Sequence, residues 1–531
     1  MTRDATGDDE ITVSERTPLV GDPENAASAW KPGHSRSSTL ASIVSVGNIR
    51  IPTAHKPTTV LGIFYLFVVL SSAAGAFQII PMTRIYEDIL CHEYFGTTPG
   101  VGEPIDEETC KNDVIQSRLA YLFAVLESLN AGLSCLVALL WGIVADRIGR
   151  KPVLAIASLG YVIYIFIIII VAWFSAVLPV RLVWISSVAH LFGGQPAMLA
   201  AMYSILSDLI PESNRSISFM RIHVTSMVGN LVSPALASAM MSSTGPWPVM
   251  LLTFILYILA AAPIILIPET FHRSHQSEPS DDAESHHVTI KTRVLQGFNQ
   301  LKDSLSIVRI RSVALILCIC VVSLPVIVCT FQFMVQFISK RYHIPLAETG
   351  YIQSLYGISH IVVVLLIIPF ISNLIVRPTL PDWLRVTDEK HRDLILVRWS
   401  YVAYVAGTFI LAVSPSLPVF VVGLIVMSLG SGSASFIKSI ATFHVDPEHR
   451  SRLFTLMALV EMASSIWATP ALAGLFTLGM RLGGEWIGLP YLGVSFTCLI
   501  MLILAIFVQT PAGDRCDEES SPDRESLIEH N

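Results

Sequence analysis

Twelve long apolar segments constrain the fold of this chain more than any other feature. A helix needs about 20 apolar residues to cross the hydrocarbon core of a bilayer. Composition agrees, because 53% of the residues are hydrophobic and 14% are charged, whereas soluble domains carry about 25% charged residues. The sequence therefore predicts an all-α membrane protein whose transmembrane helices occupy residues 59–83, 117–142, 152–174, 181–207, 217–241, 247–268, 312–338, 347–372, 394–414, 417–442, 453–478 and 489–509.

The basic residues of the connecting loops fall mainly on one side of this array. If both tails are cytosolic, the cytosolic loops hold eighteen Lys and Arg residues and the opposite loops hold seven. Because cytosolic loops carry the excess of positive charge in membrane proteins, only this orientation fits. The single glycosylation sequon, at Asn214, then lies in the cytosol and is expected to stay unmodified.

The longest polar stretch between apolar segments separates the sixth from the seventh. It predicts two bundles of six helices, at 56–271 and 312–512, joined by a cytosolic linker at 272–311. The second part of the linker has basic and apolar residues at helical spacing, which is typical of an amphipathic helix at a membrane surface. The polar tails, 1–55 and 513–531, lack a periodic apolar face and are predicted to be disordered.

An internal repeat supports the division into two halves. Pro211 and Pro234 are 23 residues apart, as are Pro447 and Pro470, and the two pairs are offset by 236 residues. At the same offset, Gly194 falls on Gly430. Six-helix halves related by duplication are typical of transporters, so the bundles are predicted to be pseudo-symmetric.

A charged motif, GIVADRIGRKP, occupies residues 142–152 in the turn after the second segment. The excess of positive charge in cytosolic turns accounts for Arg150 and Lys151, but not for an acid or for two spaced glycines. The stretch resembles the pattern G-x-x-x-D-R-x-G-R-[RK] of the major facilitator superfamily at every defined position. These positions are Gly142, Asp146, Arg147, Gly149, Arg150 and Lys151.

The resemblance, which spans about residues 57–512, implies a transporter that works by alternating access. Gly142 would let a neighbouring helix approach closely. Asp146 would accept hydrogen bonds from the amino-terminal amides of segment 453–478, where the helix dipole favours an anion. Arg147 and Arg150 would hold that acid in a charge network. We call this predicted contact, which would stabilise the outward-open state, the latch.

Candidate residues for a substrate cavity follow from the same resemblance, because helices one, four, seven and ten line the cavity in this superfamily. Serine and glycine on these helices more often pack helices together than touch a ligand. The larger polar side chains, together with one from segment eight, are the candidates: Gln78, His190, Gln195, Gln332, Gln336, Gln353 and Lys438.

Ionisable residues inside the membrane are candidates for coupling transport to protons. A charge at the bilayer centre costs about 2.5–3.5 kcal/mol on insertion scales, so such residues usually have a function. Glu127, Glu461 and His190 fall within apolar segments. The alternatives are that Glu127 is a neutral acid donating one hydrogen bond, that Glu461 pairs with Lys438, and that His190 only bonds across helices.

The loop after the first segment carries two cysteines, Cys91 and Cys110. It faces an oxidising space in the predicted orientation, which favours a disulfide. This loop, which begins at Arg84, looks like that of fungal members of the superfamily and distantly resembles the proton-coupled folate and heme carriers. That resemblance suggests organic solutes, anionic ones among them, with Arg84 at the mouth of the path.

These features together predict a secondary active transporter that moves a small organic solute with protons, in a direction left open between uptake and efflux. One alternative is a drug:proton antiporter, although His190 stands where that group carries arginine. Another is a non-transporting nutrient sensor on the same fold. Motifs for an enzyme, a metal, a cofactor or nucleic acid are lacking in the sequence. A monomer in the lipid bilayer of the plasma membrane is expected, with a vacuolar membrane as the alternative.

The latch gives the first testable prediction. Asp146→Asn removes the negative charge but keeps the size of the side chain, so transport should be abolished or strongly reduced while membrane insertion is retained. Transport assays on membranes with matched amounts of inserted protein measure this. Normal transport by the variant would refute the latch.

Overall fold

The computed structural model describes residues 57–97, 105–209, 212–267, 310–376, 389–445 and 450–509, all of which belong to one compact unit, Ile51–Asn531. Every regular element in these residues is a helix. The tails and almost all of the 272–311 linker lie outside the described residues, so the predicted disorder and the amphipathic helix stay predictions.

The first half of the unit contains the six segments predicted before the linker. Its helices are α1 (Pro57–Phe77), α2 (Ile79–Phe95), η2 (Thr109–Lys111), α3 (Asp113–Ile148), α4 (Arg150–Trp173), η3 (Val180–Phe192), α5 (Gly194–Leu209), α6 (Glu212–Thr244), α7 (Pro246–Ala261) and η4 (Ala262–Leu266).

The second half contains the six segments predicted after the linker. Its helices are α9 (Arg311–Val328), η6 (Cys329–Phe333), α10 (Met334–Tyr342), α11 (Leu346–Val362), η7 (Val363–Ile367), α12 (Ile368–Val376), α13 (Glu389–Val413), α14 (Leu417–Ser428), α15 (Ser433–Thr442), α16 (Arg450–Leu482), η9 (Gly484–Gly488) and α17 (Leu489–Phe507).

Eleven helices among the described residues are long and apolar enough to cross a membrane. The remaining predicted segment, 181–207, is divided into the 3₁₀-helical η3 and the α-helical α5 at Gly193 and Gly194. These glycines have φ angles of 128° and 58°, a left-handed region that other residues rarely adopt. The all-α membrane fold predicted from the sequence is confirmed, with the fourth segment interrupted.

The internal repeat of the sequence is visible as a repeated interruption. The tenth segment is divided between α14 and α15 across residues 429–432, and Gly430 is the repeat partner of Gly194. Pro234 lies inside α6, as its partner Pro470 lies inside α16. Corresponding segments of the two halves therefore deviate from a regular helix at corresponding positions.

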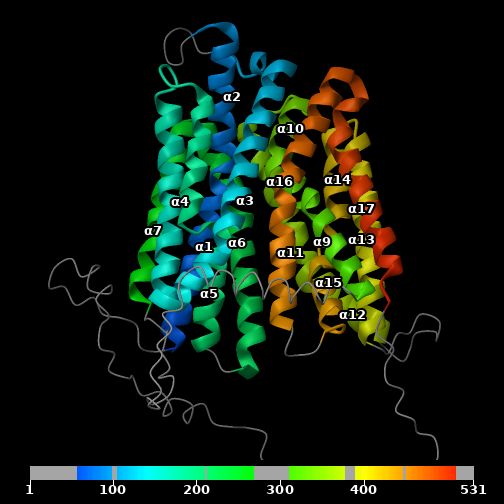
Figure 1. The fold of residues 1–531 in the computed structure, drawn as a ribbon. Coiled ribbons are helices and arrows are strands. Elements are labelled where there is room, and N and C mark those ends of the chain that lie inside the picture. Colours follow the sequence, from blue (N-terminus) through cyan, green and yellow to red (C-terminus); the bar gives the residue numbers. More distant parts are fainter. Residues whose placement is uncertain are drawn as a thin grey trace, which may run out of the picture. The chain divides into compact units, whose positions relative to one another are not determined.

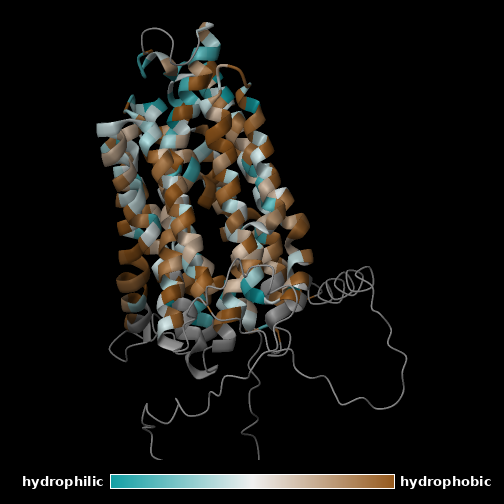
Figure 2. Cartoon of the chain, turned by 90° about the vertical axis from the view of Figure 1, so that its left-hand side faces the viewer, coloured by the Kyte–Doolittle hydropathy of each residue, from teal (hydrophilic) through white to brown (hydrophobic). Residues whose placement is uncertain are grey.

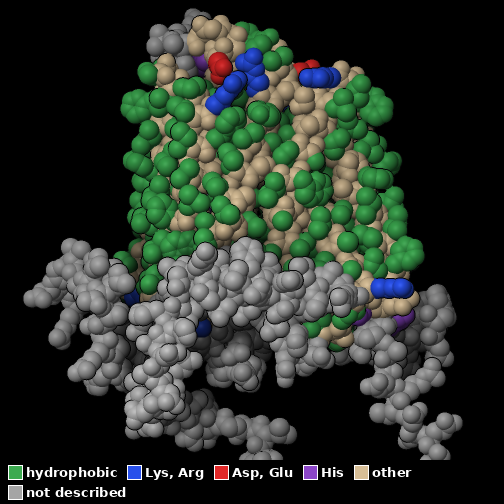
Figure 3. Space-filling view, viewed as in Figure 1, with side chains coloured by type: hydrophobic (Ala, Val, Ile, Leu, Met, Phe, Trp, Pro, Cys, Tyr) green, Lys and Arg blue, Asp and Glu red, His purple; other side chains and the backbone are tan. Residues whose placement is uncertain are grey.

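The helices of the unit run alongside one another between two ends (Figure 1). We call the end with the α2–α3 connection the disulfide end, because Cys91 and Cys110 are bonded there, and the end with residues 142–151 the motif end. Hydrophobic residues cover much of the length of the helices (Figure 2). On the face in Figure 3, the described charged side chains lie near the two ends of this hydrophobic band, as expected for a surface that faces lipid.

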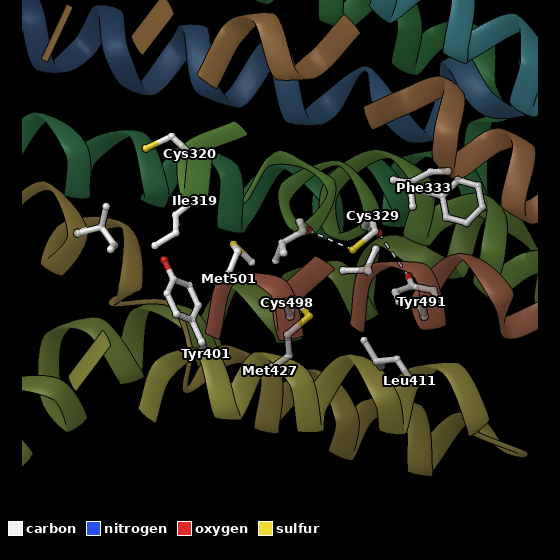
Figure 4. Close-up of a cluster of buried hydrophobic side chains, with 14 of the residues drawn as sticks. Ile319, Cys320, Cys329, Phe333, Tyr401, Leu411, Met427, Tyr491, Cys498 and Met501 are labelled. Carbon is white, nitrogen blue, oxygen red and sulfur yellow. Dashed lines mark hydrogen bonds between the residues drawn. The ribbon is translucent and has the colours of Figure 1, made fainter. Parts of the chain in front are cut away.

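Buried hydrophobic side chains of the described residues form four clusters. Two lie in the first half, one lies mainly in the second half, and one, which includes Phe77 and Val335, joins the two halves. The core of the second half is built around Cys329, Tyr401, Tyr491 and Cys498, all of them buried (Figure 4). The hydroxyl of Tyr491 donates to the backbone carbonyl of Cys329 at 3.3 Å. This tyrosine therefore fills the core with its ring and satisfies its polar atom within the same core.

Close helix contacts within a half depend on particular glycines. A Cβ atom at Gly407 of α13 would lie 2.5 Å from the backbone nitrogen of Met427 in α14. Backbone cannot move aside as a flexible side chain can, so α13 and α14 pack at this distance only because residue 407 is glycine.

This contact predicts that Gly407→Ala destabilises the protein, by about 1–3 kcal/mol from the overpacking. Gly474→Ala in α16 is the matched control, because a Cβ at Gly474 meets no described atom within 4 Å. Thermal unfolding of both variants in detergent should show a lower melting temperature for Gly407→Ala only. Equal melting temperatures would contradict the assigned packing.

Candidate functional site

A pocket lies between the two halves. It is lined from both, by Gln78, Ile79, Met82, Thr83, Ala120, Phe123, Ala124, Glu127, Val328, Gln332, Phe333, Gln336, Thr469, Leu472 and Ala473. Three of the predicted cavity residues, Gln78, Gln332 and Gln336, are among them. The lining combines apolar surface with a few hydrogen-bonding groups, which is the usual chemistry of a site for a small organic molecule.

Glu127 is the one charged side chain of this lining. Its carboxyl group hydrogen-bonds to the side chains of Gln332 and Asn130. The bond to Gln332 joins the two halves, because Glu127 lies in α3 and Gln332 in the π-helical η6. Glu127 is half-buried, and its open surface faces the pocket that it lines. An acid in this position can bind a proton or a solute.

Gln78 lies at the junction between α1 and α2. Its side-chain oxygen accepts a hydrogen bond from the hydroxyl of Tyr257 at 3.4 Å. On the other side of the pocket, Thr469 of α16 lies 3.4 Å from the hydroxyl of Ser128 in α3. The pocket is therefore bordered by polar groups that are held in place by neighbours.

Polar contacts join the two halves beside the pocket, on the side of the disulfide end. Gln336 of α10 donates to the backbone oxygen of Gln116 at 2.8 Å and to its side-chain oxygen at 3.1 Å. Gln116 in turn donates to Glu87 at 2.6 Å. Because Gln336 also lines the pocket, this chain of hydrogen bonds lies directly beside it.

Buried charges support these contacts. Lys111 and Glu87 form an ion pair at 2.7 Å, and their side chains are only 4% and 1% exposed. Lys111 also contacts Glu107 at 3.0 Å, and Arg84 lies 3.0 Å from Glu87 and 3.7 Å from Glu107. Arg84, expected at the mouth of the path, is thus engaged by two acids. The disulfide joins Cys91 to Cys110, immediately before Lys111.

The second half binds this charged cluster from the opposite side. Lys340 lies 2.6 Å from the carboxylate of Asp113, and the backbone amide of Leu346 donates to Glu107 at 2.9 Å. Burial raises the pKa of the Glu107 carboxyl, but Lys111, that backbone amide and Arg84 together hold the pKa below its ordinary value. We call the set Arg84, Glu87, Glu107, Lys111, Asp113, Gln116, Gln336 and Lys340 the gate.

Three other predicted cavity residues lie away from the pocket lining. His190 is buried in η3, with its ring against those of Tyr161 and Tyr164. Gln195, at the start of α5, is exposed. Gln353 is buried in α11 and donates to the backbone oxygen of Phe331 at 3.1 Å, which is a contact within the second half.

Lys438 and Glu461 form an ion pair at 3.3 Å between α15 and α16. Neither lines the pocket. Their side chains are 43% and 35% exposed, so both charged groups are partly accessible at the protein surface. The pair is the alternative that the sequence offered for Glu461, and it joins two helices of the second half.

The motif 142–151 is only partly described, since the side chains of Asp146 and Arg147 lie outside the described part. Gly149 separates α3 from α4 with a φ of 104°. Arg150 donates to the backbone oxygen of Ser204 at 3.0 Å, and Lys151 to that of Ile265 at 2.9 Å. Both bonds anchor the motif to its own half. At Gly142, a Cβ would meet no described atom within 4 Å, so the described helices leave it open. The latch stays a prediction.

Most of the site residues that the sequence did not single out belong to the gate. Gln116, Lys111 and Asp113 lie just before the predicted segment 117–142, where loop residues are ordinarily polar. Asn130 was not singled out because it lies within an apolar segment. A shared helix face with Glu127, three residues away, is the signal that could have found it. No group of three or more metal-ligating side chains occurs in the described ranges.

Comparison with known proteins identifies the family to which the chain belongs. The family model described as Major Facilitator Superfamily matches residues 119–387, which is more than half of the chain. The chain therefore belongs to the major facilitator superfamily. Its fold is similar to that of the D-xylose-proton symporter, with a TM-score of 0.60 and 12% identity over 85% of this chain and 98% of that one.

Two proteins with similar sequences come from fungi. The chain is 26% identical over 488 residues to the MFS efflux pump atnC of Emericella nidulans, covering 88% of this chain and 92% of that protein. It is 26% identical over 471 residues to the efflux pump ustT of Aspergillus flavus, covering 85% and 88%. Family and relatives support a multi-pass membrane protein that functions as a transporter or efflux pump for a small molecule.

The gate predicts that Lys340→Ala opens the pocket toward the disulfide end, because Lys340 joins the halves through Asp113. In a background without the free cysteines, Thr83→Cys places a thiol in the pocket lining. A membrane-impermeant thiol reagent applied from the disulfide end should label it several-fold faster in the Lys340→Ala variant.

The neighbouring Arg341→Ala is the matched control. Arg341 also forms an ion pair, at 2.8 Å, but with Glu485 of its own half. Labelling should stay at the parent rate in this variant. Equal acceleration by both substitutions would show that the effect comes from lost charge in general and not from the gate.

Proposed function

We propose that this protein exports a small organic solute by alternating access, with the pocket between the halves as the binding site. The observation that carries the proposal is the position of Glu127. This acid lies in a pocket shared by both halves and bonds to Gln332 of the opposite half. A solute that binds there changes the contacts between the halves, which is what coupling of binding to a rocking motion requires.

The gate supports a conformation in which the disulfide end is closed. Lys340, Gln336 and the backbone of Leu346 bind the first half there. With the tails in the cytosol, as the loop charges favour, the disulfide end faces the outside and the pocket would open toward the cytosol. Asp146 would then bind the opposite half only after the motion, when the gate separates.

Export is proposed because both relatives described above carry the words efflux pump in their names. An exporter of organic solutes fits the plasma membrane, with the vacuolar membrane as the alternative. We propose a monomer, because both halves of one chain complete the pocket. Because the relatives are named as pumps, the sensor alternative loses its support.

Proton coupling is proposed through Glu127. A carboxyl group that lines a mostly apolar pocket can hold a proton when the pocket is empty and release it when a solute takes over its hydrogen bonds. Solute binding and proton release are then linked through the same carboxyl group. Glu461 is a weaker candidate, since Lys438 already neutralises its charge.

The test uses purified protein in proteoliposomes and a panel of labelled organic solutes. Glu127→Gln keeps a hydrogen-bonding side chain but cannot exchange a proton, so counterflow should persist while accumulation driven by a pH gradient falls at least tenfold. Glu461→Gln is the matched control and should keep both activities.

Two results would contradict the proposal. Undiminished accumulation by Glu127→Gln would exclude coupling through this residue. Absence of counterflow for every solute of the panel, in protein that is folded and inserted, would count against transport itself.

A further inference from the structure

A cluster of polar side chains is buried inside the first half, behind the pocket. Four of its atoms have no hydrogen-bond partner in the part of the chain that the structure describes: the hydroxyl of Tyr86, Oδ1 of Asn130, the hydroxyl of Ser187 and Nε2 of His190. All four residues are at most 8% exposed. Tyr164 lies among them. We call these five residues the first-half polar cluster.

Contacts show that the cluster is one place in the molecule. Asn130 donates from Nδ2 to the hydroxyl of Tyr164 at 3.3 Å. The rings of Tyr164 and His190 are 5.0 Å apart, and Tyr86 lies within electrostatic reach of Tyr164. Ser187 precedes His190 by three residues in the 3₁₀-helical η3, so the two side chains lie on the same face of that helix.

Unpartnered polar atoms are rare in folded proteins, because more than about 90% of buried polar groups have a partner in protein or ordered water. Four such atoms around one tyrosine are therefore unexpected for a dry interior. A buried water typically makes about three hydrogen bonds to groups of this kind. Hydroxyls and imidazole both donate and accept, so they suit water as a ligand.

We propose that the first-half polar cluster binds ordered water, and that this water connects Glu127 with the break in the fourth segment. Asn130 bonds to Glu127 on one side and to Tyr164 on the other. At the break, a Cβ on Gly194 would lie 2.3 Å from the hydroxyl of Ser134 and 3.3 Å from Nδ1 of His190. Gly194 thus brings the interrupted backbone against the cluster.

The water gives protons a second route to Glu127, in addition to the solute pocket that this carboxyl group lines. This role rests on the proposed function, whereas the binding of water does not. Among the described residues, the titratable groups in electrostatic contact with Glu127 are the phenols of Tyr86, Tyr161, Tyr164 and Tyr257. Each of these hydroxyls can pass a proton along a hydrogen-bonded chain.

Radiolytic labelling tests the binding of water without any solute. A short X-ray pulse converts bound water into hydroxyl radicals, which oxidise adjacent side chains and are read by mass spectrometry. In the full-length protein in detergent, Tyr164 should be oxidised several-fold more than Tyr491. Tyr491 is equally buried, but its hydroxyl has a protein partner. Equally low oxidation of both tyrosines would overturn the proposal.

A pair of variants tests where the water is held. Asn130→Leu removes an amide from the cluster and should lower the oxidation of Tyr164 several-fold. Gln353→Leu removes an amide that is equally buried in the second half and should leave Tyr164 unchanged. Unchanged Tyr164 oxidation in Asn130→Leu would refute the site. If that variant fails to fold, the oxidation of Tyr164 relative to Tyr491 in the parent protein decides whether water is bound.

Infrared spectroscopy tests the proton route. The carboxyl band that disappears in Glu127→Gln shifts when D₂O replaces H₂O. With the pocket blocked by alkylation of Thr83→Cys, His190→Phe should slow this shift at least tenfold. An unchanged rate would refute the route. If Glu127→Gln removes no carboxyl band at any pH, proton binding by Glu127 fails, and the route fails with it. The labelling result still decides whether water is bound.

Discussion

Burial of charge between the two halves is the constraint on which the rest of the structure depends. Lys111 and Glu87 are almost fully buried, and a buried ion whose partner is removed is strongly destabilising. Their own side-chain partners, Arg84, Glu107 and Gln116, belong to the first half. The second half extends this cluster with Lys340 on Asp113 and the Leu346 amide on Glu107. The halves are therefore held together at one end by polar groups that must be hydrated when the halves separate. Separation is then a discrete step between two states.

The fold could be read from the sequence because its signals are long and redundant. Twelve apolar runs, the loop charges and the 236-residue repeat each indicate the same architecture. The interruption at Gly193 and Gly194 was not predicted, because two adjacent glycines in an apolar run are also ordinary packing residues in membrane helices. Only the φ angles of the folded chain distinguish a break from a close contact.

The pocket was partly predictable for a different reason. Gln78, Gln332 and Glu127 stand out because a polar side chain in an apolar run needs a partner. The residues of the gate that join the two halves did not stand out. Gln116 and Lys340 lie at the edges of the runs, where polar residues are common, and their roles depend on which segment of the other half lies opposite. Such pairing over more than 200 residues is a property of the tertiary structure.

The two interrupted segments also show how the halves differ. Gly194 and Gly430 occupy equivalent positions of the 236-residue sequence repeat, and each lies where its segment departs from a regular helix. Their surroundings are unlike. A Cβ at Gly194 would meet Ser134 and His190, whereas one at Gly430 would meet the ring of Tyr404. The same position of the repeat is therefore lined by polar side chains in the first half and by an aromatic ring in the second, so the two halves differ chemically at the place where both depart from a regular helix.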